Sequence, residues 1–174
     1  MCFSAFDYKC MRIAQTLLKR NFFKILQGLS RYMSNFITFA AIMRYFVWLG
    51  YDGAQYHGWQ VQPNGKSVQE ELQRGLSLLL RQETDVVGAG RTDAGVHARR
   101  MAAHFDTDAT VDVAQLAYKL NRLLPADIVI YQIEQVSPEM HARFSARRRT
   151  YHYYLHTQKA PFRRAYSCEL HFPL

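Results

Sequence analysis

The chain has few cysteines, and they form neither a disulfide pattern nor a metal-binding pattern. Three occur among 174 residues, an odd number without metal-type spacing: Cys2, Cys10 and Cys168. This scarcity excludes a disulfide framework and fits a reducing compartment. The seven histidines are scattered too, with His97 and His104 seven residues apart and His152 and His156 in or near an expected strand. We therefore predict no bound metal.

Long hydrophobic runs are missing as well. The apolar run over 36–43 is much shorter than the roughly 20 residues that a membrane-spanning helix needs, and Arg44 ends it. We therefore expect no membrane-spanning segment. Internal repeats and low-complexity segments are absent, and hydrophobic residues make up 49% of the chain, which excludes disorder over most of its length.

Acidic residues are scarce in the first 42 positions, which hold six Lys or Arg and one acid, Asp7. This basic N-terminal extension supplies +5 of the formal net charge of +8, so the total charge is weak evidence that the rest of the chain binds nucleic acid. Residues 1–42 fit a mitochondrial-type presequence, an extra helix that contacts RNA or membrane, or a misassigned start with translation beginning at Met43. We favour the misassigned start, which makes 43–174 the folded domain.

A second stretch without acids lies near the C-terminus. Residues 143–164 contain seven basic residues and no acid, and Tyr151, Tyr153 and Tyr154 are interleaved with them. Cations suit phosphates and aromatic rings suit unstacked bases, so this composition is typical of RNA binding. A solvated basic strand and loop has the same composition, so both interpretations stay open.

Capping and periodicity predict two helices. Ser67 is an N-cap, Glu70 completes a capping box, and one apolar stripe follows at helical spacing: Val68, Leu72, Leu76, Leu79 and Leu80. Asp112 is the cap of a second helix, which Pro125 ends. The stripe of this second helix contains Leu116, Leu120 and either Leu123 or Leu124.

Strands are predicted before, between and after these helices. Their expected ranges are 44–51, 85–89, 101–106, 128–133 and 150–156. The resulting order is β-α-β-β-α-β plus one strand, which places the chain in the α+β class. This order matches a ferredoxin-like or RRM-like antiparallel sheet with helices on one face.

One carboxylate stands out among small residues between the second and third of these strands. Asp93 follows Arg91 by two positions, and Gly90 and Gly95 lie on either side of it. An acid beside an arginine on a tight loop suits a nucleophile or an acid/base group. An Asx turn or a helix cap explains such an Asp equally simply. From chemistry alone, both interpretations stay open.

The complete stretch Gly-Arg-Thr-Asp-Ala-Gly-Val-His-Ala, at 90–98, resembles the active-site signature of the TruA-type tRNA pseudouridine synthases. Three further blocks resemble the same family in the same order, at 51–60, 67–70 and 141–153. The resemblance covers the chain from Arg44 onward and leaves residues 1–42 unexplained. It implies an isomerase that converts uridine to pseudouridine in the tRNA anticodon stem-loop, without a cofactor or a metal.

The resemblance also implies roles for individual residues. Asp93 is the catalytic carboxylate, Tyr151 stacks on the substrate, and Arg91 holds the nucleotide near its phosphate and assists base flipping. Thr92 and His97 are expected to shape the loop, and 51–60 to shape a wall of the RNA cleft. Four arginines are candidate RNA contacts: Arg143, Arg147, Arg148 and Arg149.

The chain departs from the family in length. The family's catalytic domain has two related halves, and this chain ends just past the first, so we expect a fragment that is inactive alone. The full-length family implies a homodimer with tRNA as partner and a cytoplasmic location, or a mitochondrial one if 1–42 is a presequence. Two alternatives are a non-catalytic RNA-binding module and an aspartate-dependent hydrolase of small molecules. A hydrolase requires a base or second acid at short spacing from Asp93, and none is present.

Overall fold

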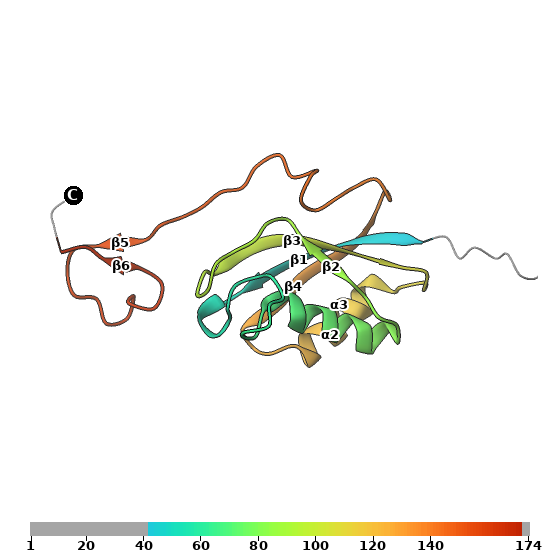
Figure 1. Ribbon diagram of the computed structural model, residues 1–174, viewed down its shortest axis with the longest axis horizontal. Helices are drawn as coiled ribbons and strands as arrows, with labels where there is room; N and C mark the ends of the chain where they lie inside the picture. The colour runs from blue at the N-terminus through green and yellow to red at the C-terminus, as the bar shows by residue number, and fades with distance from the viewer. Residues whose placement is uncertain (1–41, 172–174) are drawn as a thin grey trace, which may run out of the picture. The chain divides into compact units, whose positions relative to one another are not determined.

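The computed structural model describes residues 42–171 of the chain (Figure 1). The expectations for a presequence, a misassigned start or an extra helix concern positions that, apart from Ile42, lie outside this range. Within it, no helix has the length and apolar character needed to cross a membrane.

Four antiparallel strands form the main sheet. They are β1 (Met43–Tyr51), β2 (Val86–Gly88), β3 (Ala98–Thr107) and β4 (Ile128–Val136), in the spatial order β2-β3-β1-β4. With helix α2 between β1 and β2 and helix α3 between β3 and β4, the chain has the predicted β-α-β-β-α-β order. The predicted ferredoxin-like class is therefore confirmed, with β1 and β3 at the centre of the sheet.

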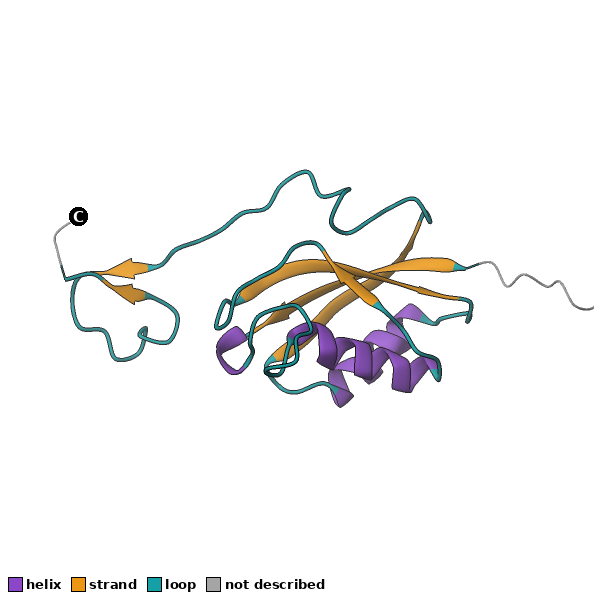
Figure 2. Cartoon of the chain, in the orientation of Figure 1, coloured by secondary structure: helices purple, strands orange, loops and turns teal. Residues whose placement is uncertain are grey.

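Both helices lie on one face of the sheet (Figure 2). Helix α2 (Val68–Leu80) begins where Ser67 Oγ accepts a hydrogen bond from the Glu70 N–H at 3.2 Å, and α3 (Val113–Leu123) begins where Asp112 Oδ1 accepts one from the Gln115 N–H at 3.0 Å. Each cap satisfies an amide that the first helical turn leaves without an intrahelical partner. Both predicted caps are therefore confirmed.

The core lies between these helices and the sheet. Strand β1 alternates, so Tyr45, Val47 and Leu49 point toward the helices and are buried. The helices bury the centre of each predicted stripe: Val68, Leu72, Leu76, Leu116, Leu120 and Leu124. Each fully buried aliphatic side chain contributes about 1.5–3 kcal/mol relative to exposure. This packing makes the sheet a rigid base for the loops at its ends.

The opposite face of the sheet is crossed by the chain after β4. We call residues 137–149 the crossing segment. Its residue Ala142 is buried and donates its N–H to Nδ1 of His104 on β3, at 3.2 Å. Phe46 of β1, which also points away from the helices, is 7% exposed. The backbone of the crossing segment, which is hydrogen-bonded to His104 of the sheet, therefore covers part of this face.

The predicted last strand, 150–156, is mostly wrong. Only β5 (Leu155–His156) is a strand, and it pairs in parallel with β6 (Cys168–Glu169). Positions 150–154 have no ladder partner among the described residues. Alternating tyrosines favour an extended backbone, but a strand also requires a neighbour for its amides and carbonyls, and local sequence does not reveal whether one is present.

Candidate active site

The carboxylate singled out from the sequence lies on an exposed turn. The signature loop, residues 89–97, connects β2 to β3, and the Val96 N–H donates to the Asp93 carbonyl at 3.2 Å. Gly95 closes the turn with φ +78°. Asp93 is exposed to solvent. A side chain in this position can meet a ligand, which a carboxylate covered by core residues cannot do.

Residues of the block 51–60 hold this loop through hydrogen bonds. The Trp59 N–H donates to the Thr92 carbonyl at 3.1 Å, and the Gly95 N–H donates to the Tyr56 carbonyl at 3.2 Å. The hydroxyls of Tyr51 and Thr92 share a hydrogen bond of 2.9 Å. Together these contacts fix the residues on both sides of Asp93. They agree with a loop-shaping role for Thr92 and a structural role for the block.

His97 anchors the end of the loop. Its Nδ1 lies 3.1 Å from the Gly53 nitrogen and 2.8 Å from Asp52 Oδ1. The Gly53 N–H donates to this nitrogen, so His97 attaches the end of the loop to residues 52–53. The Ala54 N–H and then the Tyr166 hydroxyl lower the pKa of Asp52, with a smaller contribution from His97. His97 is thus placed to shape the loop, as predicted.

Arg91 is exposed, and the structure of residues 42–171 shows no ion pair or side-chain hydrogen bond for it. A structural salt bridge to Asp93 or another acid would be the simplest alternative to a binding role. Because that bridge is not formed, the guanidinium can contact an incoming phosphate two residues from the carboxylate.

Tyr151 is also exposed, at 65%. Burial raises the pKa of Tyr51, the hydrogen bond with Thr92 opposes this shift, and the nearby Tyr151 phenol adds a smaller increase. Tyr151 thus contributes to the electrostatic environment of Tyr51, whose hydroxyl is hydrogen-bonded to Thr92 of the signature loop. Its neighbour Tyr153 is 82% exposed, so neither of these two rings belongs to the core.

The four candidate RNA-contacting arginines have different surroundings. Arg147 and Arg148 are exposed without a described partner, and Arg143 lies 5.9 Å from the Phe144 ring. The Arg149 guanidinium instead donates to the Ala89 carbonyl, at 3.1 Å from Nε and 2.8 Å from Nη2. The crossing segment therefore brings Arg149 to the start of the signature loop.

Sequence analysis did not single out Arg99 and Arg100, which begin β3 directly after the signature. The Arg100 guanidinium lies 4.8 Å from the Trp48 ring, and that of Arg99 lies 5.1 Å from the Tyr154 ring. Both arginines are exposed and combine a cation with an aromatic face, as in surfaces that bind RNA. The sequence signal that could have identified these two residues is their position as consecutive arginines directly after the signature.

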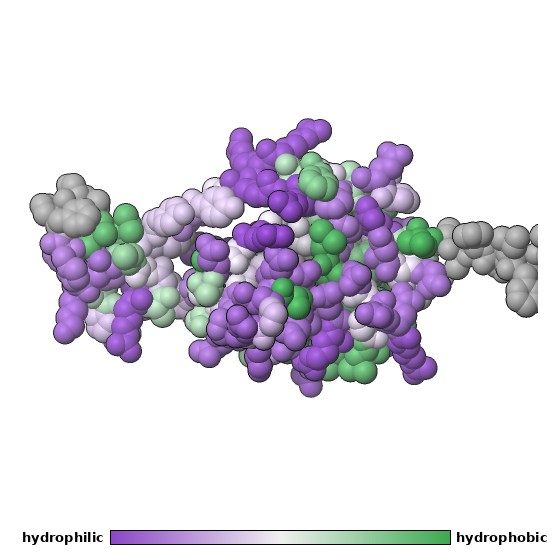
Figure 3. Space-filling view, in the orientation of Figure 1, coloured by the Kyte–Doolittle hydropathy of each residue, from purple (hydrophilic) through white to green (hydrophobic). Residues whose placement is uncertain are grey.

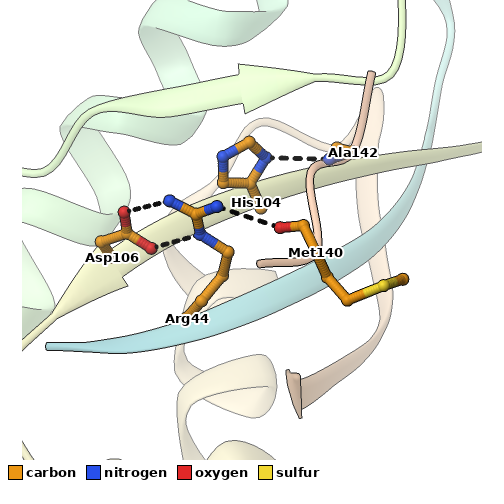
Figure 4. Close-up of polar contacts among 5 residues, drawn as sticks. All are labelled: Arg44, His104, Asp106, Met140 and Ala142. Atoms are coloured by element: carbon orange, nitrogen blue, oxygen red, sulfur yellow. Dashed lines mark hydrogen bonds and ion pairs between the residues drawn. The ribbon is translucent and has the colours of Figure 1, made fainter. Parts of the chain in front are cut away.

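The other end of the crossing segment is held at the rim of the sheet (Figure 4). Arg44 donates two hydrogen bonds of 2.7 Å to Asp106 and one of 3.0 Å to the Met140 carbonyl. His104 accepts from Ala142, as described above, and is 4% exposed. Burial, followed by the charges of Arg44 and His141, lowers the pKa of His104 to about 4. His104 is therefore neutral near pH 7, as acceptance at Nδ1 requires.

We expect the free energy of unfolding to fall as the pH drops from about 6.5 toward about 4. In this window unfolded His104 binds a proton that folded His104 does not, so acid favours unfolding, by up to about 3 kcal/mol. His104→Asn keeps an acceptor for Ala142 but does not titrate. Urea unfolding across this range should show a weaker pH dependence for the variant, and parallel curves for the two proteins would contradict the expectation.

The comparisons with known proteins agree with this geometry. The family described as tRNA pseudouridine synthase matches residues 49–145. A Bacteroides fragilis protein named tRNA pseudouridine synthase A is 56% identical over 135 residues, which cover 77% of this chain and 54% of the relative. The protein of the same name from Bacteroides thetaiotaomicron is 58% identical over 125 residues, covering 72% of this chain and 46% of the relative.

A third relative, from Parabacteroides distasonis, has the same name and is 56% identical over 120 residues, covering 68% of this chain and 48% of its own length. The chain thus spans about half the length of the curated relatives it matches. The family match includes the signature loop, its support and most of the crossing segment. With this match over more than half of its residues, the chain belongs to the tRNA pseudouridine synthase family.

Proposed function

We propose that this chain contributes the catalytic carboxylate for converting uridine to pseudouridine in tRNA, in the anticodon stem-loop. The observation that carries the proposal is the exposed Asp93 on the signature loop, two residues after the exposed Arg91; the Tyr151 ring is exposed as well. The reaction breaks the bond from the sugar to the uracil nitrogen, turns the base and rejoins it through carbon. It is an isomerisation, and the proposal includes no cofactor or metal.

Each exposed side chain has a distinct part in the proposed reaction. Asp93 acts on the sugar or the base of the target nucleotide. Extruding that base costs a few kcal/mol, and stacking on Tyr151 offsets about 1–3 kcal/mol of this. Arg91 binds the adjacent phosphate. Arg143, Arg147 and Arg148 extend the same cationic surface along the tRNA backbone.

The proposal includes tRNA as substrate and, as in the full-length family, a homodimer in the cytoplasm or, with a presequence, in mitochondria. The face shown in Figure 3 is mostly hydrophilic, with small separate hydrophobic patches. Such a surface suits a polyanionic partner better than a lipid one. We also propose that 43–174 is the unit that folds and carries the site.

The main alternative is an RNA-binding module without catalysis. The pairs Arg100–Trp48 and Arg99–Tyr154 favour it, because cations beside aromatic rings suit RNA binding whether or not Asp93 reacts. This alternative assigns no role to the exposed Asp93 carboxylate on the signature loop.

The experiment that separates the two functions measures tRNA binding and pseudouridine formation in the same samples. The chain is incubated with an unmodified tRNA transcript, and a full-length relative serves as positive control. Product above the protein-free background supports the proposal. Saturated binding without product, where the control is active, assigns RNA binding alone to this chain.

A further inference from the structure

We propose that Arg149 is a positioning residue, which fastens the crossing segment to the signature loop and thereby places Tyr151. All three arginines at 147–149 are exposed, but only Arg149 donates to backbone carbonyls; Arg147 and Arg148 have no described hydrogen-bond partner. The consequence for catalysis depends on the proposed function, but the fastening itself does not.

The first contact ties Arg149 to the beginning of the signature loop. The Ala89 carbonyl accepts from both Nε and Nη2 of Arg149, while the Ala89 N–H donates to the Ala102 carbonyl at 2.8 Å. Ala89 is therefore held by β3 on one side and by the arginine on the other. Gly90 lies directly against the guanidinium, since a Cβ placed there would be 3.6 Å from Nε.

The second contact folds the crossing segment back on itself. Nη2 of Arg149 also donates to the Arg143 carbonyl at 2.7 Å. One side chain thus closes the turn from 143 to 149 and attaches it to Ala89. The planar guanidinium presents its donors in a fixed fork that matches these carbonyls, whereas the lysine ammonium is a compact group with three rotating donors and does not reproduce this arrangement.

The remaining anchors of the segment lie upstream. Arg44 donates to the Met140 carbonyl, and His104 accepts from the Ala142 N–H. These contacts leave 143–148 as a short span held at both ends. Without Arg149, the chain after Ala142 would lose its described attachment to the signature loop.

This fastening limits where Tyr151 can lie. Two residues of extended chain reach about 7 Å, so the Tyr151 backbone stays near the Arg149 anchor beside Gly90. Nε and Nη2 are committed to carbonyls, which leaves only Nη1 of Arg149 for a phosphate. The geometry therefore makes Arg149 a poorer phosphate contact than Arg147 or Arg148.

The test compares three variants of the chain by hydrogen exchange of individual backbone amides. Arg149→Gln removes the guanidinium, Arg149→Lys keeps the charge without the fork, and Arg148→Gln removes a neighbouring exposed charge as the matched control. The informative amides are those of Ala142 and Ser145 in the crossing segment. Both donate hydrogen bonds, to His104 and to the His141 carbonyl. Amides of β1 report whether each variant is folded.

Both Arg149 variants are expected to speed exchange at Ala142 and Ser145 about tenfold, as expected for losing the free energy of an ordinary hydrogen bond. Arg148→Gln should leave these rates unchanged, and tRNA binding should weaken with it. The proposal is overturned if Arg149→Lys exchanges like the parent, or if all three variants exchange alike. Hydrogen exchange is measured without catalytic turnover. If the parent chain forms no product but the Arg149 variants exchange faster, the result contradicts the proposed function and still supports this inference.

Discussion

Replacing Asp93 with Asn is expected to lower pseudouridine formation at least about 100-fold and to leave stability nearly unchanged. The amide has the shape of the carboxylate but neither its negative charge nor its reactivity, and a positioned nucleophile or base contributes about this factor or more. Asp93 is exposed, so the free energy of unfolding should change by less than about 0.5 kcal/mol.

Product formation in a tRNA transcript, measured alongside tRNA binding, checks this expectation. The matched control is Asp108→Asn, which removes another exposed carboxylate outside the signature loop and should retain the parent's rate. An Asp93→Asn protein that forms as much product as the parent would falsify the catalytic assignment. Equal losses in both variants would attribute the effect to net charge.

Gly58→Ala is expected to destabilise the fold by roughly 2–5 kcal/mol, because a left-handed backbone and a steric overlap coincide there. Gly58 has φ +89°, a conformation that side chains with a Cβ rarely adopt. An added Cβ would also overlap the Thr92 carbonyl oxygen, the acceptor for Trp59. The loop that carries Asp93 would have to move.

Gly95→Ala is the matched control for this prediction. Gly95 has a similar φ of +78°, but no atom lies within 4 Å of the position of its Cβ. Only the cost of the left-handed backbone conformation remains, so we expect the free energy of unfolding to fall by about 1 kcal/mol. Chemical denaturation of both variants measures the difference. Similar losses for the two would show that the overlap with Thr92 is relieved without cost.

The two helices and the order of helices and strands along the chain followed from local signals that the structure confirms. Ser67 and Asp112 cap their helices through contacts only three residues away, and the leucine stripes have one periodicity. Such features depend on neighbouring residues and on one buried face, so a single sequence predicts them well. The strand over 150–156 failed because its pairing depends on residues more distant in the chain.

The candidate site also has features that the sequence predicted and features that only the structure shows. A contiguous nine-residue stretch was enough to single out Asp93 and Arg91 and to assign a family. The nine-residue stretch did not indicate how the loop is held. The residues that bind the loop come from 51–60, and Arg149, which donates to Ala89, is 60 residues away in sequence. Two arginines adjacent in sequence, Arg148 and Arg149, were indistinguishable until their surroundings were known.

Residue order alone therefore predicted the candidate reacting group and the alternation of helices and strands, since both depend on short contiguous patterns. Folding established which basic side chains donate to backbone carbonyls, and that His104 is neutral under the crossing segment. These outcomes depend on burial and on hydrogen bonds between distant residues, whose free energies exist only once the sheet brings the partners together.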